Sequence, residues 1–213
     1  MLGLIGIPIG YLLGSIPFSY FVARIFGVDD IRAVGSGNVG ATNVWRAAGW
    51  GPGLLAVFGD VGKGVAAVII ASLLAPATDG AEYYKLASGL AAVVGHIYPV
   101  FLHFKGGKGV NTALGVMLIL LPGETILALL AFIITVAISK YISLGSMIAG
   151  GSFFVIVWLE YFLNLEYVHP VYVPVSLLLA GLIVFTHRPN IKRLMTGTES
   201  KFSLHSRIEE KHG

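Results

Sequence analysis

The residues best suited to chemistry stand between positions 35 and 46, in a segment that has no acidic residue. Positions 35–43 have the sequence GSGNVGATN, and Arg46 follows three residues later. Glycine tolerates positive φ and lets the backbone approach a ligand closely, and successive N–H groups in such a turn can bind an anion. Arginine adds a planar, charged fork of donors. We therefore predict a phosphate-binding segment made of the following residues: Ser36, Gly37, Asn38, Gly40, Asn43 and Arg46.

Two other interpretations of this glycine-rich segment remain open. A run of glycines often does no more than turn the chain. Gly35, Gly37 and Gly40 also match the GxGxxG pattern of dinucleotide-binding proteins. That pattern requires a preceding strand in a βαβ unit, whereas the apolar run before it, Leu4–Ala23, has the length of a membrane span. The dinucleotide interpretation is therefore disfavoured.

A second group of residues that could donate hydrogen bonds to phosphate lies at positions 103–109, with the sequence HFKGGKG. The glycines predict a mobile turn that presents Lys105 and Lys108. The segment is not a P-loop, because Gly109 stands where that motif requires Ser or Thr after the lysine.

A third group follows the last apolar run, at positions 186–193, with the sequence THRPNIKR and with Glu199 nearby. Basic residues at the inner end of a span ordinarily anchor it, and we interpret Arg193 and the cations after it in this way. That explanation does not cover His187 and Asn190, which are further candidates for phosphate binding.

The composition indicates an integral membrane protein. Of the 213 residues 56% are hydrophobic and 12% are charged, about half the charged fraction of a soluble domain. The chain has no cysteine, and no pattern of histidines suggests metal ligands. We therefore expect neither a metal nor a cofactor, and no thiolate nucleophile. The first apolar run lacks a basic leader and an AxA-like cleavage site, so we expect it to be retained.

The chain contains seven apolar segments, which predict an all-α membrane protein. The predicted spans are Leu4–Ala23, Gly53–Leu74, Leu86–Leu102, Ala113–Leu121, Ile126–Ser139, Ser143–Leu163 and Val171–Phe185. Pro122 and Gly123 interrupt the fourth and fifth, which could form one broken helix or two short spans.

Two features of the spans predict how they pack. Gly6, Gly10 and Gly14 recur at every fourth position and predict a smooth helix face for close packing. Asp60 and Lys63, at i and i+3 in the second span, predict a pair that neutralises its own charge. A functional role for either residue is the less favoured alternative.

The distribution of Lys and Arg predicts the orientation of the spans. Seven spans with the N-terminus outside leave Lys85 as the only outer cation. The inner cations are Arg24, Arg32, Arg46, Lys105, Lys108, Lys140, Arg188, Lys192, Arg193 and those of the tail. This asymmetry follows the positive-inside rule and brings all three donor-rich segments to the inner face. Asp79 and His205 are then expected on opposite sides of the membrane.

Donors for phosphate oxygens at one membrane face suggest a lipid-phosphate enzyme or an organophosphate carrier. A carrier needs a polar path through the bilayer centre, and these spans contain few ionisable groups. A non-catalytic membrane scaffold would leave the clustered donors unexplained.

The three donor-rich segments resemble those of a known family, the bacterial acyl-phosphate:glycerol-3-phosphate acyltransferases. The matching stretches are GSGNVGATN at 35–43 with Arg46, GHIYPVFLHFKGGKGV at 95–110 and THRPNIKRLMTGTE at 186–199. They occur in the family's order, and the similarity extends over nearly the whole chain.

The resemblance implies one membrane-embedded domain over residues 1–213, with seven transmembrane helices, an outer N-terminus and a cytoplasmic C-terminus. It implies an active site at the cytoplasmic face of the bacterial inner membrane, with residues 200–213 as a polar cytoplasmic tail. The implied reaction moves a fatty acyl group from acyl phosphate to the sn-1 hydroxyl of sn-glycerol 3-phosphate. The product, lysophosphatidic acid, enters phospholipid synthesis. The expected partners are these substrates, the bilayer and a soluble enzyme that forms acyl phosphate, with no nucleic acid.

The resemblance also implies roles for individual residues. The expected catalytic residues are Ser36, Lys105, His187 and Asn190. The expected phosphate-binding residues are Ser36, Gly37, Asn38, Gly40, Asn43, Arg46, Lys105, Lys108, Ser143, His187 and Asn190. An acyl phosphate is an activated mixed anhydride, so positioning and charge stabilisation suffice without a covalent intermediate on the enzyme. Either the leaving phosphate or His187 would take the proton of the attacking hydroxyl.

Overall fold

The computed structural model describes residues 2–75, 80–165 and 168–203. Within these residues every regular element is a helix, as expected. Asp79, His205 and most of the predicted polar tail lie outside the described residues. The chain divides into two compact units, which meet in sequence between Leu120 and Leu121. The expectation of one domain over residues 1–213 stays a prediction.

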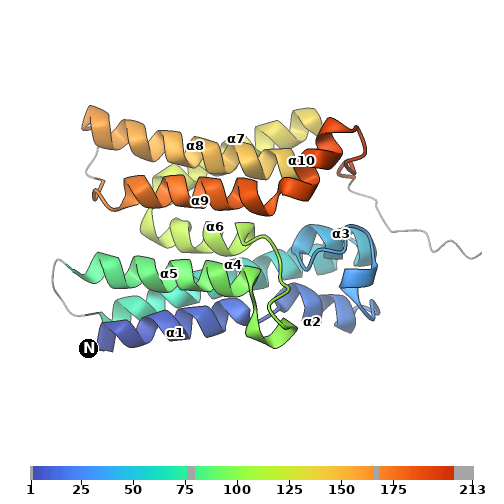
Figure 1. Cartoon of the computed structure of the whole chain (residues 1–213), viewed down its shortest axis with the longest axis horizontal. Helices are drawn as coiled ribbons and strands as arrows, with labels where there is room; N and C mark the ends of the chain where they lie inside the picture. Colours follow the sequence, from blue (N-terminus) through green and yellow to red (C-terminus); the bar gives the residue numbers. More distant parts are fainter. Residues whose placement is uncertain (1, 76–79, 166–167, 204–213) are drawn as a thin grey trace, which may run out of the picture. The chain divides into compact units, whose positions relative to one another are not determined.

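Unit 1 contains the first six α-helices and two short 3₁₀ helices. Its elements are α1 (Leu2–Ser15), α2 (Phe18–Ile25), η1 (Ile31–Ala33), α3 (Ala41–Ala48), α4 (Trp50–Leu74), α5 (Ala81–Ile97), η2 (Val100–Leu102) and α6 (Val110–Leu120). Helices α1, α4, α5 and α6 lie side by side, and the shorter α2 and α3 pack against α4 (Figure 1).

Unit 2 contains the last four helices. They are α7 (Pro122–Ser139), α8 (Ile142–Leu163), α9 (Tyr172–Thr186) and α10 (Arg188–Met195). Helix α8 packs against both α7 and α9, and α10 continues from α9 after a bend of 59°. The fourth and fifth predicted spans are separate helices, because the backbone leaves the helical region at Leu121 and Pro122 begins a new helix.

The smooth glycine face predicted in the first span is confirmed by its packing. Gly6, Gly10 and Gly14 are all buried. A Cβ atom at Gly10 would lie 2.3 Å from the Ser88 carbonyl oxygen, and one at Gly14 would lie 2.0 Å from that of Ala92. The absence of side chains therefore allows the backbones of α1 and α5 to touch. Such contact is how small residues hold helices together in a membrane.

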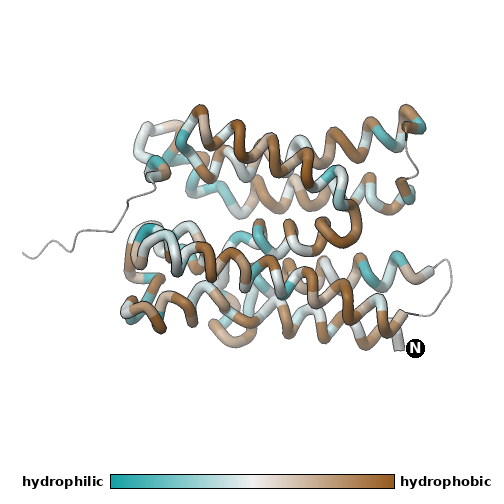
Figure 2. The backbone as a smooth tube through the Cα atoms, turned by 180° about the vertical axis from the view of Figure 1, so that it is seen from behind, coloured by the Kyte–Doolittle hydropathy of each residue, from teal (hydrophilic) through white to brown (hydrophobic). Residues whose placement is uncertain are grey.

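The lengths of the helices support a membrane location without fixing the number of spans. Among the described residues five helical stretches are long and apolar enough to cross a membrane, or six if α9 and α10 are counted together. Helix α6 is apolar but has only 11 residues. Hydrophobic residues run along the long helices, and hydrophilic ones gather mainly in the connections and at helix ends (Figure 2). The count of seven and the orientation of the termini stay predictions.

Candidate functional site

The glycine-rich segment 35–43 folds as a tight loop before α3. Gly35 and Gly37 adopt φ values of 59° and 69°, a region that side-chain-bearing residues rarely occupy. The Gly37 N–H donates to the Val34 carbonyl oxygen at 3.0 Å. Positive φ at these two glycines is the conformation on which the predicted phosphate-binding turn depends. Gly40, in contrast, has extended backbone and precedes the first residue of α3.

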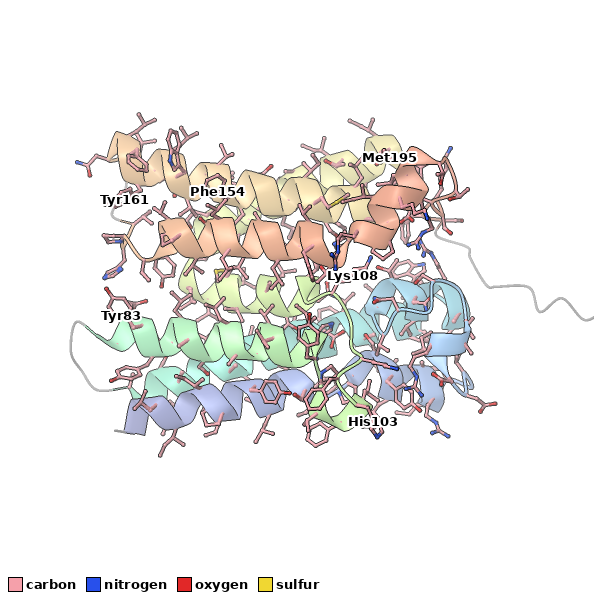
Figure 3. The ribbon with its side chains drawn as sticks, in the orientation of Figure 1. Tyr83, His103, Lys108, Phe154, Tyr161 and Met195 are labelled. Atoms are coloured by element: carbon pink, nitrogen blue, oxygen red, sulfur yellow. The ribbon has the colours of Figure 1, made fainter. Side chains whose placement is uncertain are left out.

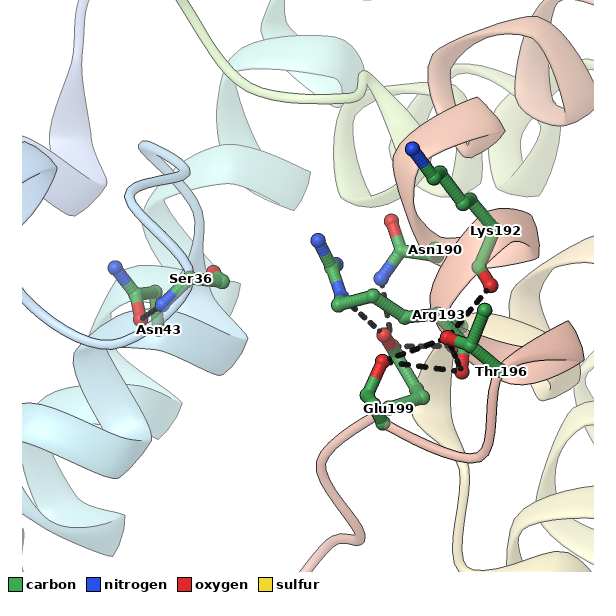
Figure 4. Close-up of polar contacts among 9 residues, drawn as sticks. Ser36, Asn43, Asn190, Lys192, Arg193, Thr196 and Glu199 are labelled. Carbon is green, nitrogen blue, oxygen red and sulfur yellow. Dashed lines mark hydrogen bonds and ion pairs between the residues drawn. The ribbon is translucent and has the colours of Figure 1, made fainter.

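Asn43 holds this loop together from inside. Its Oδ1 accepts a hydrogen bond of 3.0 Å from the Ser36 N–H (Figure 4). Its Nδ2 donates to the carbonyl oxygens of Ile31, Val34 and Asn38 at 2.9–3.2 Å. The residue is only 1% exposed. We therefore assign Asn43 to support of the loop and no longer to direct contact with phosphate.

The remaining hydrogen-bond donors of this segment belong to a loop and a helix that pack on an apolar cluster. Ile31 and Val44, both fully buried, belong to an apolar cluster beneath the loop and α3. Ser36 is exposed, and Arg46 is half-buried one turn after Asn43 on α3. The segment thus places a hydroxyl and a guanidinium on one rigid support, which lowers the entropy cost of ligand binding.

The second donor-rich segment, 103–109, is held in place by backbone hydrogen bonds. His103 and Phe104 both have positive φ, 52° and 60°. The N–H groups of Gly106 and Gly107 each donate at 3.1 Å to the last turn of α5. The expectation of a mobile turn is therefore not supported, because these glycines serve close backbone approach. Lys105 is exposed, whereas Lys108 is half-buried just before α6 (Figure 3).

The two donor segments of unit 1 meet at Gly107. A Cβ atom at this position would lie 2.5 Å from the Val39 carbonyl oxygen, which belongs to the glycine-rich segment. The chain thus brings together two stretches that are more than sixty positions apart in the sequence. We call residues 35–46 and 105–108 the phosphate-donor segments, because they carry the predicted hydrogen-bond donors to phosphate.

Unit 2 gathers a second set of polar side chains around Glu199. Its Oε1 accepts hydrogen bonds from Ser143 Oγ at 2.7 Å and from Asn190 Nδ2 at 2.6 Å. Its Oε2 lies 2.7 Å from Arg193 Nε (Figure 4). Ser143 and Asn190, two predicted site residues, are therefore adjacent. Arg193 is more than the membrane anchor expected from the sequence, because it pairs with this carboxylate.

The environment of Glu199 favours its charged form. Burial by itself raises the pKa of this carboxyl. The hydrogen bonds from Ser143, Asn190 and Arg193, together with the positive charge of Arg193, outweigh burial, and the pKa of Glu199 lies below its usual value. Glu199 is therefore an ionised acceptor near neutral pH and is poorly suited to act as a general base.

His187 lies at the bend between α9 and α10. It is 2% exposed, and its Nδ1 lies 2.8 Å from the Ile183 carbonyl oxygen. Because a carbonyl oxygen can only accept, this contact assigns the proton of a neutral ring to Nδ1 and the lone pair to Nε2. The backbone of α9 therefore fixes both the orientation of the ring and the nitrogen that can accept a proton.

The three predicted donor-rich segments are thus divided between the units: the first two lie together in unit 1, and the third lies in unit 2. In the part of the chain that the structure describes, no group of three or more His, Asp or Glu residues could hold a metal ion. The central position of Glu199 was not predicted. A glutamate nine positions after Asn190 gives no periodic signal for such a contact.

Comparison with known proteins identifies the relatives of this chain. The model of the family described as glycerol-3-phosphate acyltransferase matches residues 4–197. The glycerol-3-phosphate acyltransferase of Syntrophomonas wolfei is 45% identical over 91% of this chain and 93% of its own length. That of Geobacter sulfurreducens is 44% identical over 91% and 94%.

Two crystal structures of PlsY, an integral membrane glycerol 3-phosphate acyltransferase, resemble this fold. The glycerol 3-phosphate form has a TM-score of 0.84 and 38% identity, and the similarity covers 94% of this chain and 96% of PlsY. The lysophosphatidic acid form has a TM-score of 0.81, 38% identity and coverage of 95% and 96%.

Proposed function

Since this chain belongs to the glycerol-3-phosphate acyltransferase family, we propose that it transfers a fatty acyl group from acyl phosphate to the sn-1 hydroxyl of sn-glycerol 3-phosphate. The products are lysophosphatidic acid and inorganic phosphate, and the reaction supplies phospholipid synthesis. The PlsY structures were obtained with glycerol 3-phosphate and with lysophosphatidic acid, which supports this acceptor and this product for the present chain.

The observation that carries the proposal is the junction of the two phosphate-donor segments at Val39 and Gly107. Both substrates carry a phosphate, and these segments offer backbone N–H groups, the Ser36 hydroxyl and the cations Arg46 and Lys105. Such donors stabilise phosphate charge in the ground state and as it develops on the leaving group. We propose that Ser36, Arg46 and Lys105 contact substrate phosphate. Lys108 and Asn38 complete the proposed phosphate-binding set. The predicted contacts from Gly37 and Gly40 are left out, because their N–H groups donate to the carbonyl oxygens of Val34 and Asn38 within the loop, both at 3.0 Å.

The chemistry needs no covalent intermediate on the enzyme. The sn-1 hydroxyl oxygen attacks the acyl carbonyl carbon, and the bond from that carbon to the phosphate oxygen breaks. The leaving phosphate accepts the hydroxyl proton, so the step is balanced without another base. His187 orients the substrates, and it is the alternative base. We propose that Ser143 and Asn190 also contact substrate and that Glu199 holds their side chains in place.

We further propose that the reaction takes place at the cytoplasmic face of a bacterial plasma membrane. Seven spans with an outer N-terminus would put both phosphate-donor segments, His187 and Asn190 on this face. The phosphate end of acyl phosphate, which a soluble enzyme forms, would then lie at the cytoplasmic surface, while the acyl chain of the substrate and of the product lies in the bilayer.

The test is turnover by the purified protein in detergent with radiolabelled glycerol 3-phosphate. Acyl phosphate should give radiolabelled lysophosphatidic acid, and acyl-CoA or an acyl carrier protein offered alone should not. Equal turnover with acyl-CoA alone would refute the proposed donor. In vesicles, label that crosses the membrane unchanged would instead indicate a carrier. Label that is neither bound nor converted would indicate a scaffold.

A further inference from the structure

A buried polar cluster lies among the helices of unit 1, apart from the phosphate-donor segments. Asp60 on α4 is 1% exposed and its Oδ2 accepts a hydrogen bond of 2.7 Å from Ser19 Oγ on α2. Its Oδ1 lies 3.0 Å from Lys63 Nζ and 3.4 Å from His96 Nδ1. Lys63 Nζ also donates to the Ile16 carbonyl oxygen at 2.8 Å. The predicted Asp60–Lys63 pair is therefore confirmed, and it has three additional partners, namely Ser19, His96 and the Ile16 carbonyl group.

The cluster reaches the phosphate-donor segments through His96. The backbone carbonyls of His96 and Ile97 accept the hydrogen bonds from Gly107 and Gly106, both at 3.1 Å. The ring is equally close, since a Cβ atom on Gly107 would lie 2.2 Å from His96 Nε2 and 2.5 Å from the Val39 carbonyl oxygen. Gly107 is thus held between the imidazole and the glycine-rich segment.

A small cavity connects these groups. It has a volume of about 10 Å³ and is lined by Asp60, Lys63 and His96 together with Val39 and Gly107. This volume is at the lower limit for one water molecule. The charged pair and the backbone junction of the two phosphate-donor segments therefore border the same small cavity.

Stability alone does not explain the presence of this ion pair. Removing two charges from water is costly, and replacing a buried pair by apolar residues of similar volume is often neutral or stabilising. What the pair does provide is a fixed orientation for the Asp60 carboxylate. Asp60 is held by Ser19 and Lys63, and its Oδ1 faces the His96 ring, 3.4 Å from Nδ1.

We infer that Asp60 and Lys63 are positioning residues that act through His96. By fixing the ring, they hold the Gly106–Gly107 turn against Val39 and so set the separation between Arg46 and Lys105. This inference rests on the proposed function, because it takes both of these cations as phosphate ligands. A displacement of about 1 Å in such a site is enough to weaken its action by orders of magnitude.

The test separates positioning from folding with a pair replacement, Asp60→Leu with Lys63→Met. We expect purified full-length protein with a melting temperature equal to or above that of the wild type. Its dissociation constant for glycerol 3-phosphate, measured by calorimetry, should rise at least about tenfold. The control is Ser88→Ala, which removes buried hydrogen bonds to Gly6 and Ala67 from the same helix as His96. It should lower the melting temperature and leave the affinity unchanged.

A second variant, His96→Asn, keeps the contacts of Asp60 with Ser19 and Lys63 and decides the question if the pair replacement does not fold. It should raise the same dissociation constant. Combining His96→Asn with the pair replacement should raise the dissociation constant little further, because both changes interrupt the same series of contacts. Affinities within about threefold of the wild type, or losses that simply add, would overturn the inference. A wild type that binds glycerol 3-phosphate without turning over acyl phosphate would refute the proposed donor, while these affinities would still decide the inference.

Discussion

Asn190 donates a hydrogen bond of 2.6 Å from its Nδ2 to Oε1 of Glu199, the same oxygen that accepts a bond from the Ser143 hydroxyl. Two residues expected to bind substrate are thus fixed by a carboxylate from outside the helices that carry them. Arg193 holds the other oxygen of that carboxylate. The segment that follows α10 therefore fixes the positions of both side chains.

We expect Glu199→Gln to destabilise the protein. The substitution removes the negative charge and turns an amide NH₂ toward the Arg193 guanidinium, which is itself a donor. The Arg193 side chain is 36% exposed, so solvent weakens the pair and we expect a loss of about 1–2 kcal/mol. At about 2–4 °C per kcal/mol for a chain of this size, the melting temperature should fall by roughly 2–8 °C. Asp29→Asn, an equal change of charge at an exposed site, is the control, and an equal effect of the two variants would contradict this role.

The same carboxylate predicts a dependence of stability on pH. Because the pKa of Glu199 is lower in the folded protein than usual, the folded state binds fewer protons than the unfolded state. The resulting stabilisation is complete above the usual glutamate pKa of about 4.3 and is lost as the pH falls through the lower folded value. The difference in melting temperature between wild type and Glu199→Gln should therefore shrink between about pH 6 and about pH 3. A constant difference over this range would show that ionisation of Glu199 contributes nothing.

Local patterns in the sequence predicted most of the helices and part of the packing. Each of the seven apolar segments overlaps a helix, although a break at Ile16 and Pro17 divides the first segment between α1 and α2. The spacing of Gly6, Gly10 and Gly14 indicated a face for close packing. The i, i+3 spacing of Asp60 and Lys63 likewise predicted their pairing. These features depend on helical periodicity, which a sequence displays directly.

Contacts across the fold could not be predicted in this way. Glu199 and Ser143 are 56 positions apart, and Asn43 directs its amide into its own loop. His96 stands next to Gly107 only because α5 ends where the second phosphate-donor segment folds back. Each of these polar groups has several partners of the right chemistry in the sequence, and tertiary structure selects among them.

The close contact of α1 with α5 predicts that Gly14→Ala is destabilising. The new Cβ atom would lie 2.0 Å from the Ala92 carbonyl oxygen and 2.6 Å from its Cα, so the backbones must separate. Such overpacking typically costs about 1–3 kcal/mol. Gly62→Ala on α4 is the matched control, because nothing lies within 4 Å of its added Cβ. We expect a lower melting temperature for Gly14→Ala alone, and equal values would argue against tight packing at this crossing.

The seven-span topology can be tested with single cysteines in this cysteine-free chain. Suitable exposed positions are Asp29, Tyr83 and Lys201. Seven spans with an outer N-terminus place Asp29→Cys and Lys201→Cys on the cytoplasmic side and Tyr83→Cys on the other. An impermeant maleimide applied to intact cells should therefore label Tyr83→Cys only. Labelling of Lys201→Cys from outside, with Asp29→Cys protected, would mean an even number of spans.

The roles of Arg46 and Lys105 lead to the most direct kinetic prediction. If each contacts substrate phosphate, its loss removes a charge-assisted hydrogen bond worth roughly 1.5–3 kcal/mol. This corresponds to a decrease in kcat/KM on the order of 10- to 150-fold for Arg46→Ala and for Lys105→Ala. Arg46→Lys should recover only part of the loss, because lysine keeps the charge without the planar fork.

The alternative is that both cations only anchor the chain at the inner face of the membrane. An anchor tolerates exchange of Arg for Lys, and its loss lowers the yield of protein rather than the turnover of each folded molecule. Arg24→Ala, at an exposed cation at the end of α2, provides the matched control and should keep wild-type kcat/KM. Kinetics are therefore measured on monodisperse protein for all four variants. Wild-type values for Arg46→Ala and Lys105→Ala would leave both residues as anchors and remove them from the phosphate site.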